Sequence, residues 1–404
     1  MDFTFDARTE ELRKDLLDFM DTHVHPGESV FAEQLGQLEN PWAWSEVPVL
    51  AELRAEARRR GLWNLFLPGE HGAGLTNLQY APLAEITGRS PQVAPEALNC
   101  AAPDTGNMEL LHLHGTPEQQ RRWLLPLLEA EIRSAFSMTE PDVASSDASN
   151  IALRMTPTAD GGFVLDGRKW WSTGAGHPDC RVGIFMGLTD PSADRHRQHS
   201  MVVVPLEAPG VRVERMLTAL GQYDEPLGHG EVSLTAVRLP RSAILAGPGR
   251  AFEIAQGRLG PGRVHHCMRL VGLAEKALEL ACQRSTTRVA FGKPIANLGG
   301  NRERIADARI AINRSRLLVM HAAWLLDQGM SREAYSAVSE IKVEVPNMAL
   351  DVIDMAIQLH GGAGLSDDFP LAMSWVSSRA LRLADGPDEV HKGMVARLEL
   401  GKYS

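Results

Sequence analysis

Cysteine is scarce in this chain of 404 residues, and its four copies exclude two kinds of site. Cys100, Cys180, Cys267 and Cys282 form no Cys-x-x-Cys pair, and their spacing matches neither a disulfide framework nor a zinc site. The histidine pairs have no cysteine or acid at metal spacing, so no metal is expected. The scarcity fits a reducing compartment. We expect a cytoplasmic protein, or a matrix-like location if the chain is processed.

Long apolar runs and excess positive charge are also missing. No stretch reaches the length of a membrane span, so none is expected. Residues 1–6 lack a signal pattern, and residues 401–404 are not a Ser-Lys-Leu peroxisomal address. The net charge of −10 disfavours binding to nucleic acid. The apolar share of 44% is ordinary for a globular protein, and the length favours two or three packed regions.

The hydrophobic period changes twice along the chain. Residues 1–133 carry helical patterns, which predict helices over 11–20, 49–61 and 117–131. Short apolar runs bounded by Gly, Pro or Asp then predict strands over 162–167, 182–186 and 201–204. Helical patterns return over 264–283, 305–326 and 332–359. We expect a mixed α and β chain with an N-terminal helical domain (1–133), a small middle β-barrel domain (134–245) and a C-terminal four-helix bundle (246–404).

Five segments contain candidate site residues, and each has an ordinary structural explanation when taken alone. Turn chemistry explains residues 136–147, and packing of aromatic rings in the core explains 169–176. A cation at a helix end explains 288–295, glycine capping explains 358–364, and acids at a helix start explain 383–391. Each also has a functional interpretation. Backbone N–H groups, a Trp-x-Thr strand end, an arginine and close-approach glycines are all suited to a flavin and its pyrophosphate.

Together the five segments resemble the acyl-CoA dehydrogenase family in order and spacing, over nearly the whole chain. Members usually show a Thr-Glu-Pro loop, a Trp-x-Thr strand end, an Arg-x-x-Phe-Gly turn, a Gln-x-x-Gly-Gly turn and a catalytic acid before the last helix. All five are present here, from Thr139 to Asp385. The sequence looks closest to the subgroup of family members ten and eleven, whose catalytic acid is Asp. Some of those members carry a kinase-like domain before the dehydrogenase part, and no such domain is expected within these 404 residues.

The resemblance implies FAD as the cofactor and acyl-CoA as the substrate. It implies that residues of both strand ends and of the last turn bind FAD, namely Phe136, Met138, Thr139, Ser145, Ser146, Trp171, Ser172, Thr173, Pro387 and Glu389. It implies a homodimer or homotetramer in which a neighbouring subunit's FAD is held by Arg288, Phe291, Gln358, Gly361 and Gly362. On the substrate side it implies Ser146, Arg263 and Gly386.

The resemblance also implies the reaction. Asp385 would take the α-proton and flavin N5 the β-hydride, giving the trans-2-enoyl-CoA, in fatty acid β-oxidation or related acyl-CoA catabolism. Its side chain is one methylene, roughly 1.5 Å, shorter than the glutamate of most members. An entering acyl chain would disfavour its charged form, and hydrogen bonds to the thioester carbonyl would stabilise the enolate. An electron-transfer flavoprotein is the implied electron acceptor.

Two alternatives to a dehydrogenase stay open. One is a flavin oxidase of the same fold, either an acyl-CoA oxidase or a nitroalkane-oxidase-like enzyme. The other is a non-catalytic flavin or acyl-CoA binding protein. Two departures from the family pattern bear on this choice: the Thr-Glu-Pro loop has one extra residue, and Gly260 replaces an acid at the CoA end. The polar loop 190–199 is expected to be a solvated hairpin, with a place near the CoA phosphate as the alternative.

Overall fold

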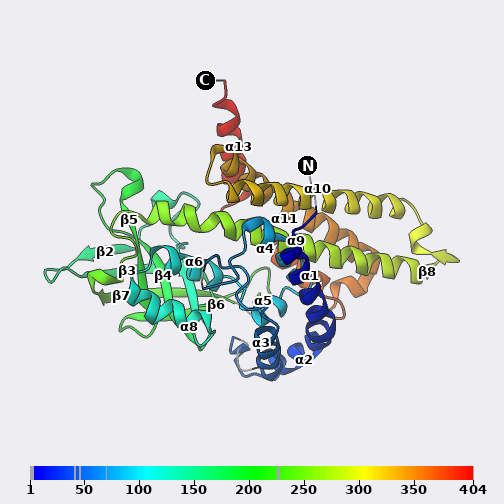
Figure 1. Ribbon diagram of the computed structural model, residues 1–404, viewed down its shortest axis with the longest axis horizontal. Coiled ribbons are helices and arrows are strands. Elements are labelled where there is room, and N and C mark those ends of the chain that lie inside the picture. The colour runs from blue at the N-terminus through cyan, green and yellow to red at the C-terminus, as the bar shows by residue number, and fades with distance from the viewer. Residues whose placement is uncertain (1–3, 41, 45–46, 70, 225–227, 404) are drawn as a thin grey trace. The chain divides into compact units, whose positions relative to one another are not determined.

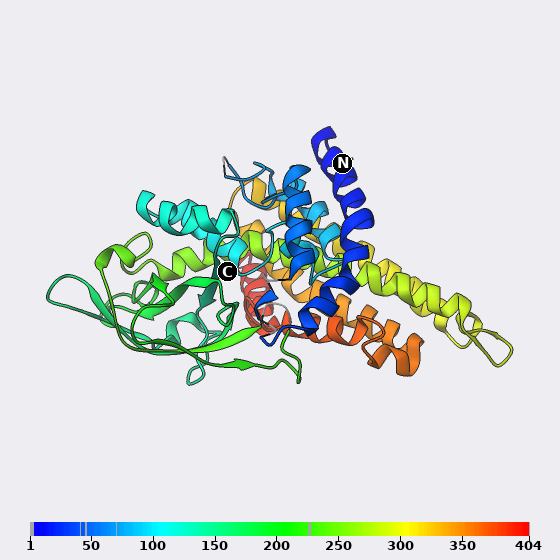
Figure 2. The same cartoon turned by 90° about the horizontal axis from the view of Figure 1, so that it is seen from below.

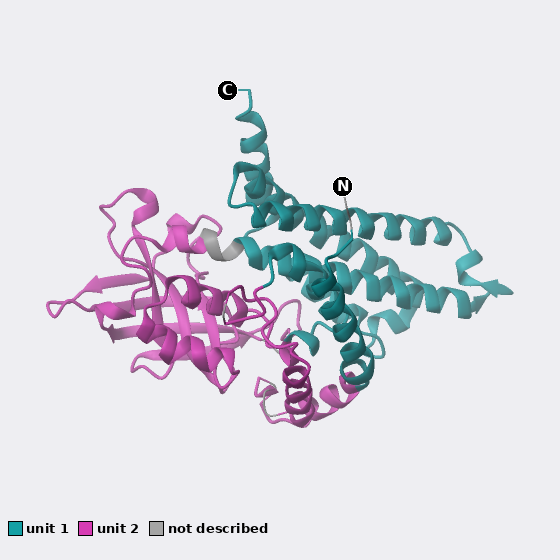
Figure 3. Cartoon of the chain, viewed as in Figure 1, with its two compact units in different colours: residues 1–26, 75–95, 260–404 teal, residues 27–74, 96–259 magenta. Residues whose placement is uncertain are grey.

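The computed structural model describes residues 4–40, 42–44, 47–69, 71–224 and 228–403, without the side chains of 256–259. Its contacts form two compact units, which interleave along the chain (Figure 3). The first comprises residues 1–26, 75–95 and 260–404, and the second residues 27–74 and 96–259. The mixed α and β class is confirmed. The three-part division at residues 133 and 245 stays a prediction.

The first unit is built around three long helices that alternate in direction (Figures 1 and 2). They are α9 (Ala251–Thr287, with residues 260 onward in this unit), α10 (Asn301–Asp327) and α11 (Arg332–His360). A hairpin of β8 (Val289–Ala290) and β9 (Lys293–Pro294), followed by the 3₁₀ turn η7 (Ile295–Asn297), joins α9 to α10. The other elements are α1 (Ala7–Phe19), η1 (Met20–Val24), α4 (Asn77–Thr87), η8 (Gly361–Leu365), α12 (Leu371–Ala380) and α13 (Asp388–Leu400). The helices predicted over 264–283, 305–326 and 332–359 are confirmed.

Close backbone contact holds α4 against α9. A Cβ atom at Gly272 would overlap the carbonyl group of Glu85, and one at Gly88 would overlap backbone atoms of α9. Only glycine therefore fits at this crossing. Arg316 on α10 donates hydrogen bonds to the carboxylates of Glu85 and Glu275, which ties α4, α9 and α10 together. This framework supports the turn before α13.

The second unit contains a seven-stranded sheet with the order β1-β4-β2-β3-β7-β6, and β5 pairs with β4. Only the β1–β4 pair and the single β2–β4 bridge are parallel. The strands are β1 (Arg133–Ser137), β2 (Arg154–Pro157), β3 (Phe163–Thr173), β4 (Cys180–Leu188), β5 (His199–Pro205), β6 (Val211–Leu217) and β7 (His229–Leu239). The helical segments are α2 (His25–Gly36), α3 (Pro48–Arg59), α5 (Ala94–Ala97), α6 (Asp104–His114), α7 (Pro117–Gln119), η3 (Gln120–Leu124) and α8 (Leu125–Leu128), of which α2 and α5 begin in the first unit. The strands predicted over 162–167, 182–186 and 201–204 are confirmed.

An apolar core fixes the sheet. Leu165, Phe185, Val204, Val232 and Val237 are at most 1% exposed. Burying each such side chain contributes about 1.5–3 kcal/mol to stability. Strand β5 is buried on both faces, which explains its unbroken apolar run.

Candidate active site

Two strand ends meet at one edge of the sheet in the second unit. The Ser137 hydroxyl, at the end of β1, donates to the Ser172 hydroxyl near the end of β3 at 2.8 Å. The Trp170 N–H donates to the Thr139 carbonyl at 3.0 Å. The structure therefore brings the predicted Thr-Glu-Pro loop and Trp-x-Thr strand end together.

A buried ion pair fixes the Thr-Glu-Pro loop from beneath. Lys169 Nζ lies 2.7 Å from the Glu140 carboxylate and donates to the Met138 carbonyl at 2.9 Å. The same carboxylate accepts the N–H groups of Ala152 and Leu153 at 2.8 Å each. Burial lowers the Lys169 pKa to about 8, against the attraction of Glu140. The loop residue between Met138 and Glu140 is thus held on both sides.

Trp171 has a strained backbone and an exposed ring. Its φ is 54°, in the left-handed region that a bulky residue rarely adopts. The strain accompanies a shift of register between Lys169 and Ser172 in the β3–β7 pair. The residue is 38% exposed. Strain of this kind costs on the order of 1–3 kcal/mol and clusters at ligand sites, so the indole is a candidate platform for a planar ring.

The residues on either side of this bulge differ in what they can offer a ligand. Ser172 is fully buried and its hydroxyl is bonded to Ser137, so only its backbone can face a ligand. Thr173 is half-buried, and its hydroxyl oxygen lies 2.9 Å from His229 Nδ1. Phe136 is half-buried and pairs with Ile184 on β4.

The loop after Thr139 carries the two predicted serines. The Ser145 hydroxyl accepts the Glu140 N–H at 2.9 Å, so it shapes the loop itself. Ser146 is exposed. Arg195 donates to the Asp147 carboxylate at 2.8 Å, which links this loop to residues 190–199. Those residues join the antiparallel strands β4 and β5 and are mostly exposed, so the predicted solvated hairpin is confirmed.

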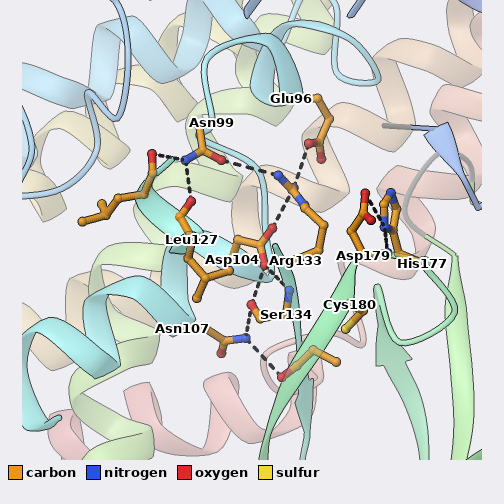
Figure 4. A network of polar contacts seen from close by, with 12 residues as sticks. Glu96, Asn99, Asp104, Asn107, Leu127, Arg133, Ser134, His177, Asp179 and Cys180 are labelled. Atoms are coloured by element: carbon orange, nitrogen blue, oxygen red, sulfur yellow. Dashed lines mark hydrogen bonds and ion pairs between the residues drawn. The ribbon is translucent and has the colours of Figure 1, made fainter. Parts of the chain in front are cut away.

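A buried charged network anchors the start of β1 (Figure 4). Arg133 lies 2.8 Å from Glu96 and 2.7 Å from Asp104. Burial opposes its charge, yet the two carboxylates raise its pKa. Asp104 also accepts the Ser134 N–H at 2.8 Å, and the Asn107 amide donates to the Ser134 hydroxyl at 2.9 Å. The strand that leads to the Thr-Glu-Pro loop is therefore fixed at its first residues.

Asp385 lies in the first unit, in the turn between α12 and α13. Its φ is 56°, and Gly386 follows with a φ of 99°. Among residues with a Cβ, Asp and Asn adopt this left-handed conformation most readily. The Asp385 side chain is 23% exposed, so it is reachable from outside yet largely enclosed.

Three side chains hold this turn through its backbone carbonyls. Arg263 donates to the Asp385 carbonyl at 2.9 Å, and His391 Nε2 lies 3.2 Å from the same oxygen. Lys342 Nζ donates to the carbonyls of Leu381 and Ala384 at 2.6 and 2.8 Å. Burial lowers the pKa of Lys342, and that of His391 to about 4. These donors therefore position Asp385 through the main chain of its turn.

A histidine lies beside the Asp385 carboxylate. His266 Nε2, on α9, is 3.9 Å from Asp385 Oδ2, and its side chain is 27% exposed. This distance is too long for a hydrogen bond but short enough for an electrostatic interaction when the ring is protonated. His266 can thus stabilise the anionic form of Asp385.

Asp388, the second aspartate of this segment, has a structural role. Asp388 is buried and accepts hydrogen bonds from Arg382 at 2.8 Å and Asn347 at 3.2 Å, which lower its pKa against the effect of burial. Pro387 is the N-cap of α13, without a capping side chain, and Glu389 is exposed in the first turn. Of the two aspartates of this turn, Asp385 is therefore the one whose side chain is available to a ligand.

The remaining predicted residues lie at one end of the helical bundle. Arg288 and Phe291 are exposed in the hairpin after α9, with Phe291 95% exposed. Gln358, Gly361 and Gly362 are exposed at the end of α11. Because α10 runs back between α9 and α11, both sets lie at the same end (Figure 2). A Cβ at Gly361 or Gly362 would meet no atom within 4 Å, so this surface is open.

Three family models match the chain almost end to end. They are described as the N-terminal, middle and C-terminal domains of acyl-CoA dehydrogenase, and they match residues 6–131, 135–237 and 249–400. The chain belongs to the acyl-CoA dehydrogenase family. It is accordingly an enzyme of the acyl-CoA dehydrogenase class.

Several acyl-CoA dehydrogenases are similar over most of this chain. FadE2 of Mycobacterium tuberculosis is 51% identical over 403 residues, covering 100% of this chain and 98% of that protein. Acyl-CoA dehydrogenase family member 11 of Homo sapiens is 48% identical over 95% of this chain and 49% of that protein. A Mycobacterium abscessus acyl-CoA dehydrogenase structure is 63% identical, with a TM-score of 0.96 and full coverage of both chains. These relatives confirm the predicted subgroup, whereas its aspartate base stays a prediction.

The chain spans about half the length of family member 11, and 37% of the length of member 10 of Mus musculus, which is 50% identical over 98% of this chain.

A solved structure of the same fold contains the expected cofactor. PigA, whose structure contains FAD, shares the acyl-CoA dehydrogenase fold at 21% identity and a TM-score of 0.84, over 100% of both chains. FAD as the cofactor thus follows from membership of the family.

Several residues of this acyl-CoA dehydrogenase site escape a reading of the sequence. Lys169, His229 and His266 lie beside the predicted residues Met138, Thr173 and Asp385, which are far away in sequence. Lys342 donates to the carbonyl of Ala384, next to Asp385, and His391 lies only six positions after Asp385. The positions of Lys169 and His391 within the segments 169–176 and 383–391 could have suggested a role for these two residues. Among the described residues, no cluster of three or more His, Cys, Asp or Glu could hold a metal. No described helix is both long and apolar enough to cross a membrane.

Proposed function

We propose that this enzyme catalyses FAD-dependent α,β-dehydrogenation of an acyl-CoA thioester, with Asp385 as the base. The observation that carries the proposal is the turn that presents Asp385. Its backbone is left-handed and held by Arg263 and His391, and its carboxylate is partly enclosed beside His266. A side chain held this way satisfies the positioning that proton abstraction requires.

The residues at the sheet edge fit a flavin. The exposed Trp171 indole offers a flat apolar face, and the Thr173 hydroxyl is fixed by His229 at one side of it. The Thr139 carbonyl is bonded to Trp170, so the Thr-Glu-Pro backbone is rigid where it borders the ring. When bound, the flavin would take the hydride from Cβ.

Asp385 would remove the proton from Cα. A protonated His266, at 3.9 Å, would favour the carboxylate form that must be present before the reaction, whereas the acyl chain would exclude water and make that form more reactive. The Asp385 N–H is the proposed donor to the thioester carbonyl, and the bonds of Arg263 and His391 to the Asp385 carbonyl hold the turn that carries it. Arg263 thus supports the turn that carries Asp385. The resemblance implies a further contact of Arg263 with CoA.

The exposed residues at the end of the bundle support a cofactor shared between copies. Arg263 and Thr287 lie 24 positions apart on α9, which is roughly 36 Å along the helix. Arg288 and Phe291 therefore lie far from Asp385 within one chain. We propose that they, with Gln358, Gly361 and Gly362, bind the FAD of a second copy in a homodimer or homotetramer.

Anaerobic mixing with a panel of acyl-CoA esters tests the proposal through bleaching of the flavin absorbance. We expect Asp385→Asn to bind FAD normally, because Asn tolerates the left-handed turn, and to bleach about 10²–10⁴-fold more slowly. Asp15→Asn, an exposed acid on α1, is the matched control. Near-normal bleaching by Asp385→Asn would exclude this residue as the base.

Further measurements test the remaining parts of the proposal. Slow reoxidation by oxygen after bleaching supports a dehydrogenase that passes electrons to an electron-transfer flavoprotein, whereas fast reoxidation supports an oxidase. A colourless protein that takes up no FAD would refute the proposed function. The panel also assigns the acyl chain length and branching, and hence the place in fatty acid β-oxidation or related acyl-CoA catabolism.

A further inference from the structure

A carboxylate, an imidazole and a hydroxyl form a chain of hydrogen bonds at the sheet edge. His229 Nε2 lies 2.9 Å from Asp224 Oδ2, and His229 Nδ1 lies 2.9 Å from Thr173 Oγ1. The His229 and Asp224 side chains are 13% and 20% exposed, so both are largely shielded from water. Enzymes use the same order of groups to orient and polarise a hydroxyl.

The backbone sets this arrangement. Thr173 ends β3 and His229 begins β7, and the two residues are direct partners in the antiparallel register. Asp224 has a φ of 55°, and its carbonyl accepts the Gly228 N–H at 3.1 Å, which returns the chain towards His229. A Cβ at Gly228 would overlap the Trp42 ring, so the end of this turn is tightly packed. Residues 225–227 lie outside the described part of the chain.

The groups around the imidazole determine its hydrogen bonding. Trp171 and Thr173 face it from β3, with the Trp171 ring centroid at 5.4 Å, and its partner on β6 is the apolar Leu217. Within the described residues, Asp224 is the charged side chain in contact with the ring. An ionised carboxylate can only accept hydrogen bonds, so His229 Nε2 carries a proton.

The protonation of His229 Nδ1 then sets the direction of the bond to Thr173. In the neutral ring, Nδ1 accepts the Thr173 O–H, and the hydroxyl oxygen offers only lone pairs to a ligand. In the protonated ring, Nδ1 donates to that oxygen, and the O–H becomes available to donate. N5 of oxidised flavin is an acceptor, whereas the reduced flavin carries an N5–H donor.

We propose that Asp224 and His229 are positioning residues that set the hydrogen-bond direction of Thr173 towards flavin N5, and thereby the reduction potential of the flavin. The inference rests on the proposed function, because it takes FAD to lie beside Thr173. The neutral ring favours reduced flavin, and the protonated ring favours oxidised flavin. Reduction therefore releases the His229 proton to solvent. Because reduction of a bound flavin would also take up a proton, this release would make the reduction potential less dependent on pH than it would be without His229.

The midpoint potential of the bound flavin, measured from pH 5 to 9 with a chemical reductant, tests this coupling without acyl-CoA. We expect the wild-type potential to depend less on pH than that of a variant without this histidine. The midpoint potential of His229→Gln should instead fall steadily by about 30 mV per pH unit, because each unit is a tenfold change in proton concentration for a two-electron couple. His321→Gln, an exposed histidine on α10, should follow wild type. Equal slopes in wild type and His229→Gln, or a steeper wild-type slope, would overturn the inference.

Asp224→Asn tests the direction of the hydrogen bonds. Its amide can donate to His229 Nε2, which moves the ring proton to Nδ1 and leaves the Thr173 O–H free to donate. We expect oxidised flavin to be favoured about tenfold, a potential about 30 mV more negative. In a Thr173→Val background the same change should have no effect. A shift that persists there would show that Asp224 acts through another route.

Nitrogen NMR of labelled histidine in the FAD-free protein gives a readout independent of the flavin. Wild type should show His229 protonated at Nε2, and Asp224→Asn should show it protonated at Nδ1. An unchanged tautomer in a folded Asp224→Asn variant would contradict the inference. A protein that binds FAD but oxidises no acyl-CoA would refute the proposed reaction and leave this inference intact, whereas one that binds no FAD would refute both.

Discussion

Replacing Asp385 by glutamate tests the geometry of the base turn. The substitution adds one methylene and moves the carboxylate by roughly 1.5 Å. It also places a longer side chain on a backbone with a φ of 56°, at a strain of on the order of 1 kcal/mol. Because Arg263, His391 and Lys342 hold the turn through its carbonyls, the backbone cannot easily retreat to compensate. A displacement of about 1 Å at a reacting group can cost about 100-fold in rate, so we expect flavin reduction by acyl-CoA to slow about 100-fold, or about 2.7 kcal/mol of barrier.

Stopped-flow bleaching under anaerobic conditions measures this rate directly. Asp385→Glu should retain its FAD content and its unfolding temperature within a few degrees, because the side chain is partly exposed. Asp15→Glu on the exposed face of α1 is the matched control and should bleach at the wild-type rate. If Asp385→Glu also bleached at the wild-type rate, the turn would not be fixing the position of the carboxylate. The glutamate of most family members would then be interchangeable with this aspartate.

Three further substitutions test the supports of the site. Between about pH 8 and 10.5, the free energy of unfolding of wild type should rise by up to about 3 kcal/mol relative to that of Lys169→Met. The reason is that Lys169 in the unfolded chain keeps a proton that the buried amine of the folded protein loses. Urea unfolding at both pH limits measures this difference, and Lys14→Met, at an exposed position, is the control. Arg133→Met should destabilise the second unit by about 3–5 kcal/mol, because two buried carboxylates lose their counter-charge, and a thermal shift measures it. Arg263→Gln should reduce bleaching about tenfold without loss of FAD, because the Asp385 carbonyl loses a charged donor; an unchanged rate would show that the turn holds without it.

Much of the fold follows from local pattern in the sequence. The apolar run of β5 and the helical periods within α9, α10 and α11 predict those elements, because a face that is buried requires apolar residues at a regular spacing. The motif segments likewise indicate which strand end and which turn contribute to a site. These are properties of consecutive residues, and they were predictable.

The supports of the site were not predictable in this way. Lys169 meets Glu140 only because β3 lies over the loop after β1, and His229 meets Thr173 through the register of β3 and β7. The inward Ser172 side chain depends on a bulge that no period indicates. Contacts of this kind depend on how distant segments pack, so a single sequence without relatives does not reveal them.

The length of α9 has a consequence for mixed populations of this enzyme. Asp385 lies near one end of the bundle and Arg288 beyond the other. Under the proposed sharing of FAD, a copy without the Asp385 carboxylate could still contribute its hairpin to the FAD site of a neighbour. If FAD is shared between copies as proposed, a preparation of Asp385→Asn combined with a preparation of Arg288→Gln, each inactive alone, should regain part of the wild-type turnover after subunit exchange. Genetic complementation between two such alleles would be the cellular counterpart.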